Sequence, residues 1–311
     1  ESFEIIPGGY ILVDDSGVIA GVYTSDTFAH SDEIQVVDFG NKLLTPAMND
    51  LHVHAPQFAN MGIAMDVPLL LWLNKYTFPE EAKFADIDYA RTIYTQFVDE
   101  LVKQGTMRAA VFATVHTPAT LLLADLFHQK GIGAHIGLVG MDRNSPDNLC
   151  NQVDEAISGT EQLMDYTKDY PLVNAIVTPR FVPSCSPEML RALAQQANAL
   201  ELPIQSHLCE TPNEIKWVKE LEPEALSYAD VYHRYGLLTK NTLMAHCVYP
   251  SDVDIALLQQ TGTTIVHCPT SNCNLTSGIA PIRELLDAGI PVTLGSDVAT
   301  GHVLSMFQVM Q

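Results

Sequence analysis

The sequence predicts an α/β fold in which parallel strands alternate with helices around a closed barrel. The chain has 311 residues, which suits one α/β barrel with a small appendage. Eight short β-prone segments alternate with amphipathic segments along most of its length. Histidines and acids stand at the ends of several of these strands, and only a closed sheet brings the first and eighth strands together. We therefore expect a TIM (β/α)8 barrel.

The N-terminal part of the chain predicts the appendage. Residues 10–46 hold short β-prone pieces that are broken by Asp-Ser-Gly and Gly-Asn turn signals. We assign residues 1–46 to the N-terminal part of a small β domain of the β-sandwich type. We assign residues 47–311 to the barrel.

The predicted barrel strands and helices follow in order. Two helical segments carry clear boundary signals, because residues 88–105 end in Gly105 and residues 186–201 begin with the N-cap signal Ser-Pro-Glu. An open doubly wound sheet is the alternative architecture. It would leave the polar ends of the first and eighth strands far apart. The eight strands are expected at residues 48–54, 107–116, 133–140, 172–179, 202–208, 242–247, 263–269 and 291–297.

The charge of the chain excludes some classes of partner. With 16 Lys and Arg against 37 Asp and Glu, the net charge is −21, and no basic cluster offsets it. Binding to a phosphate backbone or docking on an anionic membrane is therefore not expected. The chain shows no apolar run of transmembrane length and no signal peptide, and the six cysteines contain no CxxC pair. We expect a cytoplasmic protein with unpaired, packed thiols.

The stretch DLHVH at residues 50–54 predicts a metal site. In a strand, His52 and His54 point to the same face, so both imidazoles can approach one ion. The pair alone also suits surface or core histidines. His207, His246 and Asp297 lie at the predicted ends of three further strands. Imidazoles with a carboxylate and no thiolate suit Zn²⁺, with Fe²⁺ or Mn²⁺ as alternatives, and an open position would lower the pKa of a bound water toward about 7.

The stretch SHLCE at residues 206–210 adds a candidate proton carrier. Glu210 follows His207 by three residues, just past the strand end, and a turn there can bring its carboxyl group over the metal. The alternative is that Glu210 is an acid at the start of the helix that follows. For His246, the alternative is a buried histidine that is hydrogen-bonded to the backbone.

Several motifs together resemble those of the amidohydrolase superfamily. They are DLHVH, SHLCE, MAHC, HCPTSN and LGSD, in this order. Within that superfamily, the stretch at residues 54–81 and the motifs VFATVHT, VTPRFVPSCS and LGSDVATG are similar to those of the guanine deaminase family. The resemblance covers essentially the whole chain. It implies one metal ion per chain, a purine substrate and a homodimer.

The resemblance also implies a role for each site residue. Asp297 would accept a proton from the metal-bound water that attacks guanine C2, Glu210 would protonate ring N3, and His246 would steady the developing charge. Xanthine and ammonia are the expected products. Arg180 would donate to a ring carbonyl, while Phe181 offers a face for stacking. The implied metal ligands are His52, His54, His207 and Asp297, and the implied substrate contacts are Gln57, Arg180, Phe181, His207 and Glu210.

Alternatives remain for the function and for single residues. A related amidohydrolase would act on another amino-heterocycle, such as 8-oxoguanine, a cytosine-like base, an adenosyl compound or a triazine. A metal-free structural relative would have lost ligands, which this chain keeps. Trp72 could pack rather than line a pocket, Gln57 could be a loop amide, and Arg180 could pair with one of the many acids.

Two departures from the family pattern stand out. Ala47 occupies a position where relatives commonly carry glycine, and it touches no expected ligand. The chain ends soon after the eighth predicted strand, whereas the family continues through a last helix and further strands of the small domain. We therefore expect a barrel that is truncated after strand eight and an incomplete β domain.

Overall fold

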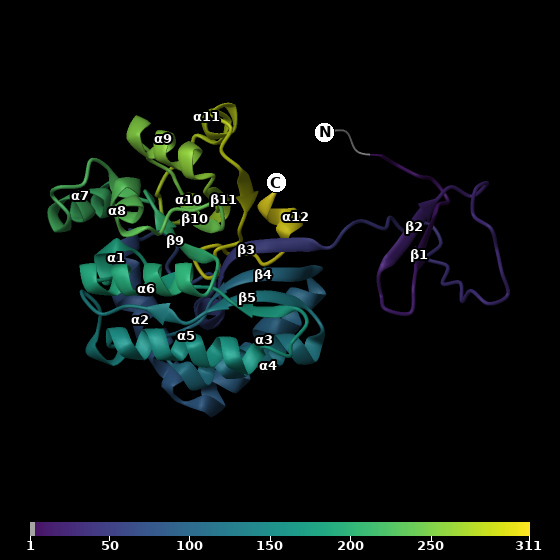
Figure 1. The fold of residues 1–311 in the computed structure, drawn as a ribbon, viewed down its shortest axis with the longest axis horizontal. Coiled ribbons are helices and arrows are strands. Elements are labelled where there is room, and N and C mark those ends of the chain that lie inside the picture. The colour runs from purple at the N-terminus through teal and green to yellow at the C-terminus, as the bar shows by residue number, and fades with distance from the viewer. Residues whose placement is uncertain (1–3) are drawn as a thin grey trace. The chain divides into compact units, whose positions relative to one another are not determined.

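The computed structural model describes residues 4–311, and its chain divides into two compact units at the bond between Pro46 and Ala47. Figure 1 labels the helices and strands of both units. None of the helices within the described residues has the length and apolar character needed to cross a membrane.

The first unit contains one antiparallel hairpin, formed by β1 (Tyr10–Val13) and β2 (Ile19–Tyr23). The Asp14 side chain stabilises its turn, because Oδ1 accepts hydrogen bonds from the backbone N–H groups of Ser16 (2.9 Å) and Val18 (3.0 Å). The second β-prone piece, residues 34–46, forms no strand. The apolar side chains at its centre are about half exposed, so they are not packed as a strand in a sandwich would be.

The second unit contains two four-stranded parallel sheets and one short parallel pair. In each sheet the neighbouring strands follow one another along the chain, as expected for repeated strand–helix units. The first sheet consists of β3 (Met48–His54), β4 (Thr106–Phe112), β5 (Gly133–Gly137) and β7 (Val173–Ala175); the second of β9 (Ile204–Leu208), β10 (Thr242–His246), β11 (Thr264–His267) and β12 (Val292–Leu294); the pair of β6 (Val139–Gly140) and β8 (Thr178–Pro179).

The two sheets are joined at each junction by two backbone hydrogen bonds rather than by a continuous ladder. At one junction, Gln205 N donates to Val177 O at 2.9 Å. At the other, Asp297 N donates to His52 O at 2.9 Å and His54 N donates to Val298 O at 3.2 Å. The strands at both junctions, β7 and β12, have only three residues each. The single eight-stranded sheet expected from the sequence is therefore seen as two parallel halves in contact.

A glycine allows one of these contacts. A Cβ atom at Gly295 would lie 2.7 Å from the Cβ of His52 and 3.0 Å from its backbone nitrogen. No side chain fits at that distance. Gly295 therefore lets the chain after β12 lie against β3, where His52 and Asp297 can meet.

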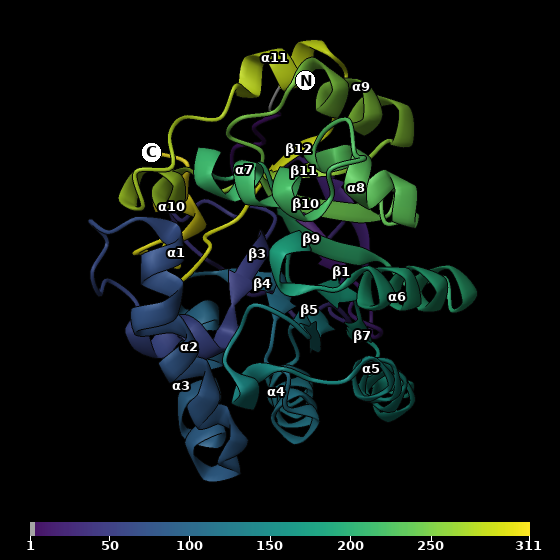
Figure 2. The same cartoon turned by 90° about the vertical axis from the view of Figure 1, so that its left-hand side faces the viewer.

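Helices surround the strands of the second unit, as Figure 2 shows for α3 to α6, α8, α9 and α11. The helix predicted at residues 88–105 is α3, whose N-cap Asp86 accepts from the backbone, and the one predicted at 186–201 is α6, capped by Ser186. The helices are α1 (Leu69–Trp72), α2 (Phe78–Glu81), α3 (Ile87–Lys103), α4 (Thr117–Lys130), α5 (Val153–Thr167), α6 (Pro187–Ala199), α7 (Pro212–Leu221), α8 (Tyr228–Tyr235), α9 (Asp252–Thr261), α10 (Pro269–Asn274), α11 (Ile282–Asp287) and α12 (Met306–Val309).

Apolar side chains fill the space between strands and helices. Phe97 and Leu101 of α3 pack with Leu123 and Phe127 of α4, and all four are fully buried. Each such side chain contributes about 1.5–3 kcal/mol relative to an exposed one. This core holds the strands in place, so that their carboxyl ends form a fixed platform for polar groups.

Candidate functional site

The carboxyl ends of the strands bring the predicted metal ligands together. His54 ends β3, His207 lies next to the end of β9 and His246 ends β10, while Asp297 follows β12 by three residues. All of them are buried. His246 (φ 74°) and Asp297 (φ 49°) have left-handed backbone conformations, in which a non-glycine residue carries a cost of about 1–3 kcal/mol. These two strained residues lie where the backbone turns, and their side chains point into the cluster.

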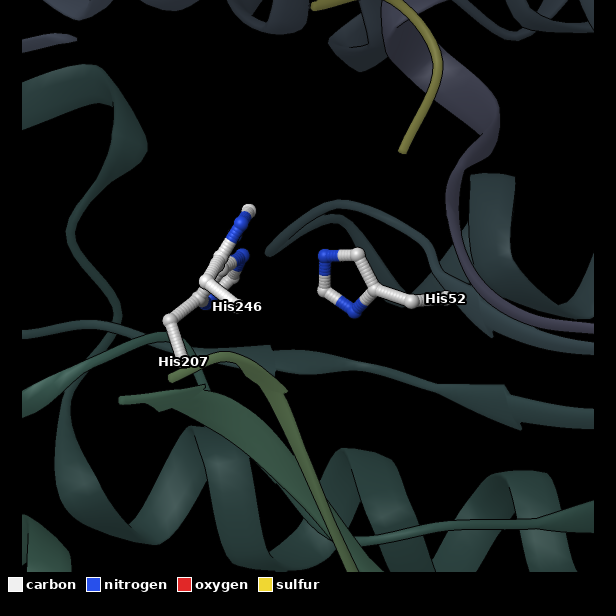
Figure 3. Close-up of side chains that lie close together, drawn as sticks. All are labelled: His52, His207 and His246. Carbon is white, nitrogen blue, oxygen red and sulfur yellow. The ribbon is translucent and has the colours of Figure 1, made fainter. Parts of the chain in front are cut away.

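Five side chains form a compact cluster at this platform. His52 Nε2 lies 3.2 Å from Asp297 Oδ1, and His54 Nε2 lies 3.4 Å from the same oxygen. The Nε2 atoms of His54 and His207 are 3.2 Å apart. The rings of His207 and His246 are stacked with centroids 5.5 Å apart, and His52 faces them from the opposite side (Figure 3).

The hydrogen bonds of the imidazoles show that this cluster suits a cation. His207 Nδ1 lies 2.6 Å from the carbonyl oxygen of Arg180, which can only accept, so Nδ1 carries the proton and Nε2 presents a lone pair. Burial lowers the pKa of His207 and of His54 well below the usual range, which keeps both rings neutral. Among the described residues, His52 Nε2 has no hydrogen-bond partner. Imidazole nitrogens that converge in this way suit a metal ion between them.

Asp297 supplies the negative charge of the cluster. Burial alone would raise its pKa, but the neighbouring imidazoles, His52 foremost, hold the pKa well below the usual range. Thr300 Oγ1 donates to Asp297 Oδ2 at 2.8 Å. Groups of His and Asp here place their ligand atoms within 4.8 Å of one another. Three imidazoles with one ionised carboxylate fit a divalent metal ion.

One thiol lies close enough to compete as a ligand. Cys268 belongs to a group with His246 and Asp297 whose ligand atoms are equally close together. Burial, followed by the charge of Asp297, raises the pKa of the Cys268 thiol well above its usual range. Cys268 is buried and forms no disulfide, as the sequence predicts for a packed thiol, and its exclusion from the ligand set stays a prediction.

Glu210 is positioned over the cluster as a protonated acid. Its Oε2 lies 3.5 Å from His246 Nε2, and its Oε1 accepts from Ser277 Oγ at 3.3 Å. Burial, reinforced by the charge of Asp297, raises the pKa of Glu210 to about 8. The helix-start interpretation is wrong for this residue, because Thr211 caps α7 and Glu214 completes the capping box.

A pocket opens beside the cluster. Trp72 is buried and also lines this pocket, so both interpretations of that residue apply, and its indole Nε1 donates to Ile63 O at 2.9 Å. Gln57 lies in the short 3₁₀ helix η1 (Ala55–Asn60), not in an open loop. Of the predicted site residues only His52 is absent from the lining, which includes His54, Gln57, Trp72, Arg180, Phe181, His207, Glu210, His246, Asp297 and Thr300.

Behind the polar wall of the pocket lies Glu81, a residue that the sequence reasoning missed. Arg180 is paired with Glu81 through two hydrogen bonds, Nη1 to Oε2 at 2.5 Å and Nη2 to Oε1 at 3.0 Å. The pairing alternative for Arg180 is therefore confirmed, and the side chain lines the pocket as well. Gln57 Nε2 also donates to Glu81 Oε1, at 2.9 Å. The three residues, Gln57, Glu81 and Arg180, are called the recognition cluster below.

The five side chains His52, His54, His207, His246 and Asp297 are called the metal cluster below. The sequence reasoning missed two further residues that contact this cluster. Asn272 Oδ1 accepts from His246 Nδ1 at 2.9 Å and so fixes the tautomer of that ring. Asp50 accepts from the backbone N–H groups of Ser296 (2.9 Å) and His52 (3.3 Å), which ties β3 to the chain after β12. Asp50 lies within the motif DLHVH and Asn272 within HCPTSN. Their place in these motifs was the sequence signal that could have identified them.

The comparison with protein families agrees with this site. The chain belongs to the amidohydrolase family, whose sequence pattern matches residues 43–311. The individual relatives point to a narrower group within that family. A guanine deaminase from Dictyostelium discoideum is 41% identical over 99% of this chain and 72% of its own length, and a probable guanine deaminase from Schizosaccharomyces pombe is 44% identical over 85% of this chain and 51% of its own.

Solved structures give the same result. A crystal structure of guanine deaminase from C. acetobutylicum, with guanine bound in the active site, has 45% identity and a TM-score of 0.95. The match covers 100% of this chain and 74% of that one. The family resemblance expected from the motifs is confirmed. The chain spans between half and three quarters of the length of these relatives.

Proposed function

We propose that this protein is a guanine deaminase that hydrolyses guanine to xanthine and ammonia. The observation that carries the proposal is the buried Arg180 in the wall of a pocket whose floor is the His/Asp cluster with a protonated Glu210. Arg180 keeps N–H donors beyond those that Glu81 accepts, and they can meet a ring carbonyl oxygen. The guanine deaminases among its relatives support the same reaction.

For the metal, we propose one Zn²⁺ per chain, with Fe²⁺ as the alternative, held by His52, His54, His207 and Asp297. The neutral, convergent imidazoles and the ionised carboxylate support this set. When bound, the ion lowers the pKa of a water molecule so that it can attack at neutral pH.

The residues of the chain then carry the protons. Asp297 accepts a proton from the attacking water, which adds to guanine C2. Glu210, protonated at neutral pH, donates its proton to ring N3, takes up the proton of the new C2 hydroxyl group and passes it to the amino group, so that the C2–N bond breaks and ammonia leaves. The proton held by Asp297 then returns to Glu210, which restores both side chains. His246, 3.5 Å from Glu210 and 3.8 Å from Asp297, stabilises the charge that develops at C2. Phe181 offers a stacking face to the purine.

We further propose that the two parallel sheets form one (β/α)8 barrel, with residues 1–46 as part of a small β domain. The backbone hydrogen bonds at Val177 and at His52 and His54 support this architecture, since they link the halves at both edges. The cytoplasmic location and the homodimer that the sequence leads us to expect stay predictions.

The test is the release of xanthine and ammonia from guanine by the zinc-loaded protein. Cytosine, adenine, 8-oxoguanine and a chlorinated triazine are tested beside it under the same conditions. Turnover of guanine alone supports the proposal. Turnover of another compound with guanine untouched would keep the hydrolytic metal site and assign the related amidohydrolase activity instead.

A further inference from the structure

Glu81 is buried in the described structure but does not line the pocket. It ends the short helix α2, its side chain is 2% exposed, and the pocket wall in front of it is formed by Gln57 and Arg180. A buried carboxylate needs partners. Those of Glu81 are the two pocket residues, which come from segments 24 and 99 residues away.

The carboxylate fixes the position of the guanidinium. Glu81 accepts from both Nη atoms of Arg180, a two-point contact that allows only one plane for the group. On its other side, the Arg180 guanidinium carbon lies 5.2 Å from the centre of the Phe78 ring. Glu81 and Phe78 together therefore hold Arg180 in one orientation before any substrate arrives.

The same carboxylate fixes the polarity of Gln57. An ionised carboxylate only accepts hydrogen bonds, so the Gln57 atom that faces Glu81 Oε1 at 2.9 Å is the amide nitrogen. The amide oxygen must then point away from Glu81. That oxygen accepts from Ala299 N at 3.5 Å and keeps a second lone pair, so Gln57 can still offer an acceptor beside the donors of Arg180.

We propose that Glu81 is a positioning residue that makes the pocket select a ring with a carbonyl oxygen next to an N–H group. This inference rests on the proposed function. Guanine carries that pair at O6 and N1, where Arg180 donates to the oxygen and Gln57 accepts from the nitrogen. 2,6-Diaminopurine carries the reversed pair, an amino donor next to a ring acceptor, on an otherwise equal purine with the same 2-amino leaving group.

The test compares the two purines in wild type and Glu81→Gln. The neutral amide can donate as well as accept, so it leaves Arg180 less fixed and lets the Gln57 amide turn over. We expect kcat/KM for guanine to fall about 10- to 100-fold, mainly through KM. The preference for guanine over 2,6-diaminopurine should fall at least tenfold, and the metal content should not change.

Two further variants separate positioning from a general structural effect. Glu81→Asp keeps the charge at shorter reach and should give an intermediate preference. Asp254→Asn removes a buried acid that accepts from Ala229 N at 2.7 Å and belongs to neither the recognition cluster nor the pocket lining, so it should leave the preference at the wild-type value.

The outcomes are distinguishable from failure of the proposed function. If the wild type releases no xanthine from guanine, the proposed function itself is wrong. If the wild type is active and Glu81→Gln loses activity equally on both purines, or loses its metal, Glu81 is only a structural residue and the inference is overturned.

Discussion

The metal cluster and the recognition cluster both contribute residues to the wall of one pocket, but they are completed in opposite ways. In the metal cluster, imidazole nitrogens converge, and His52 Nε2 has no hydrogen-bond partner among the described residues. In the recognition cluster, Glu81 and Arg180 neutralise each other, and Gln57 donates a hydrogen bond to Glu81. The first arrangement suits an added cation, whereas the charges of the second are balanced within the protein. Chemistry therefore depends on an added ion, and substrate recognition is preorganised by the fold.

The largest effect should come from Asp297→Ala, because it removes the only carboxylate proposed as a ligand. Three imidazoles then remain as ligands without a carboxylate to balance the charge of the ion. Metal affinity should fall by more than the roughly 10- to 100-fold cost of losing an outer hydrogen-bond partner. Zinc content and guanine turnover measure this. Asp287→Ala, at an exposed acid close in the chain, is the control, and metal retained in Asp297→Ala would remove that residue from the ligand set.

Glu210→Gln should separate metal binding from proton transfer. The amide keeps the shape of the side chain, but it can neither transfer a proton to N3 nor take one up again. We expect normal zinc content and a fall in kcat of about 10²- to 10⁴-fold. Glu220→Gln, at an exposed position of α7, serves as the matched control. A kcat within a few fold of the wild type would mean that another group moves the proton.

Arg180→Ala should damage recognition and stability while leaving the metal in place. The loss of a charge-assisted hydrogen bond predicts that kcat/KM for guanine falls about 10- to 100-fold. Glu81 would be left as an unpaired buried charge, which costs about 3–5 kcal/mol of unfolding free energy. Denaturant unfolding of Arg180→Ala and of the double variant Arg180→Ala/Glu81→Gln tests this, since the second should regain part of the loss. Equal stability of the two would contradict the charge argument.

The smallest effect that we expect is on the pH dependence of stability. It arises from Glu214, a buried acid next to Glu210. Burial, with the charge of Glu210 added, raises the pKa of Glu214 from 4.5 to about 7. The folded state therefore binds this proton more tightly than the unfolded state, and the stabilisation is lost as the pH rises from about 4.5 to about 7. Thermal midpoints at pH 5 and pH 7.5 should differ less in Glu214→Gln than in the wild type. In Glu214→Gln the stability still falls with pH, because burial also raises the pKa of Glu210, to about 8, and that of Asp50, to about 6.

The metal cluster could be predicted from the sequence because its residues occupy regular positions. His52 and His54 follow the two-residue period of a strand, and each of the other ligands stands at or just beyond the end of an apolar run. The parallel α/β order could be predicted for the same reason. The sequence could not predict where the short strands β7 and β12 end. Each has only three residues, and the chain leaves strand geometry there.

Glu81 could not be predicted, although the stretch that contains it was recognised. It stands next to Glu80 in the sequence FPEE, and no periodicity distinguishes the two acids. Glu80 pairs with Lys83 near the surface, whereas Glu81 turns inward to Arg180, 99 residues further along the chain. Only the packing of α2 decides which acid is buried. For residues 34–46, β propensity was misleading because the described chain provides no neighbouring strand.

Arg180 serves the two clusters with different parts of the same residue. Its side chain lines the pocket wall, while its backbone carbonyl orients the His207 ring at 2.6 Å. A carbonyl group belongs to every residue type, so a mutation at position 180 changes what the pocket recognises and leaves the imidazole oriented. Recognition at position 180 can therefore change while the imidazole keeps its orientation, provided that position 81 changes with it so that no unpaired charge stays buried.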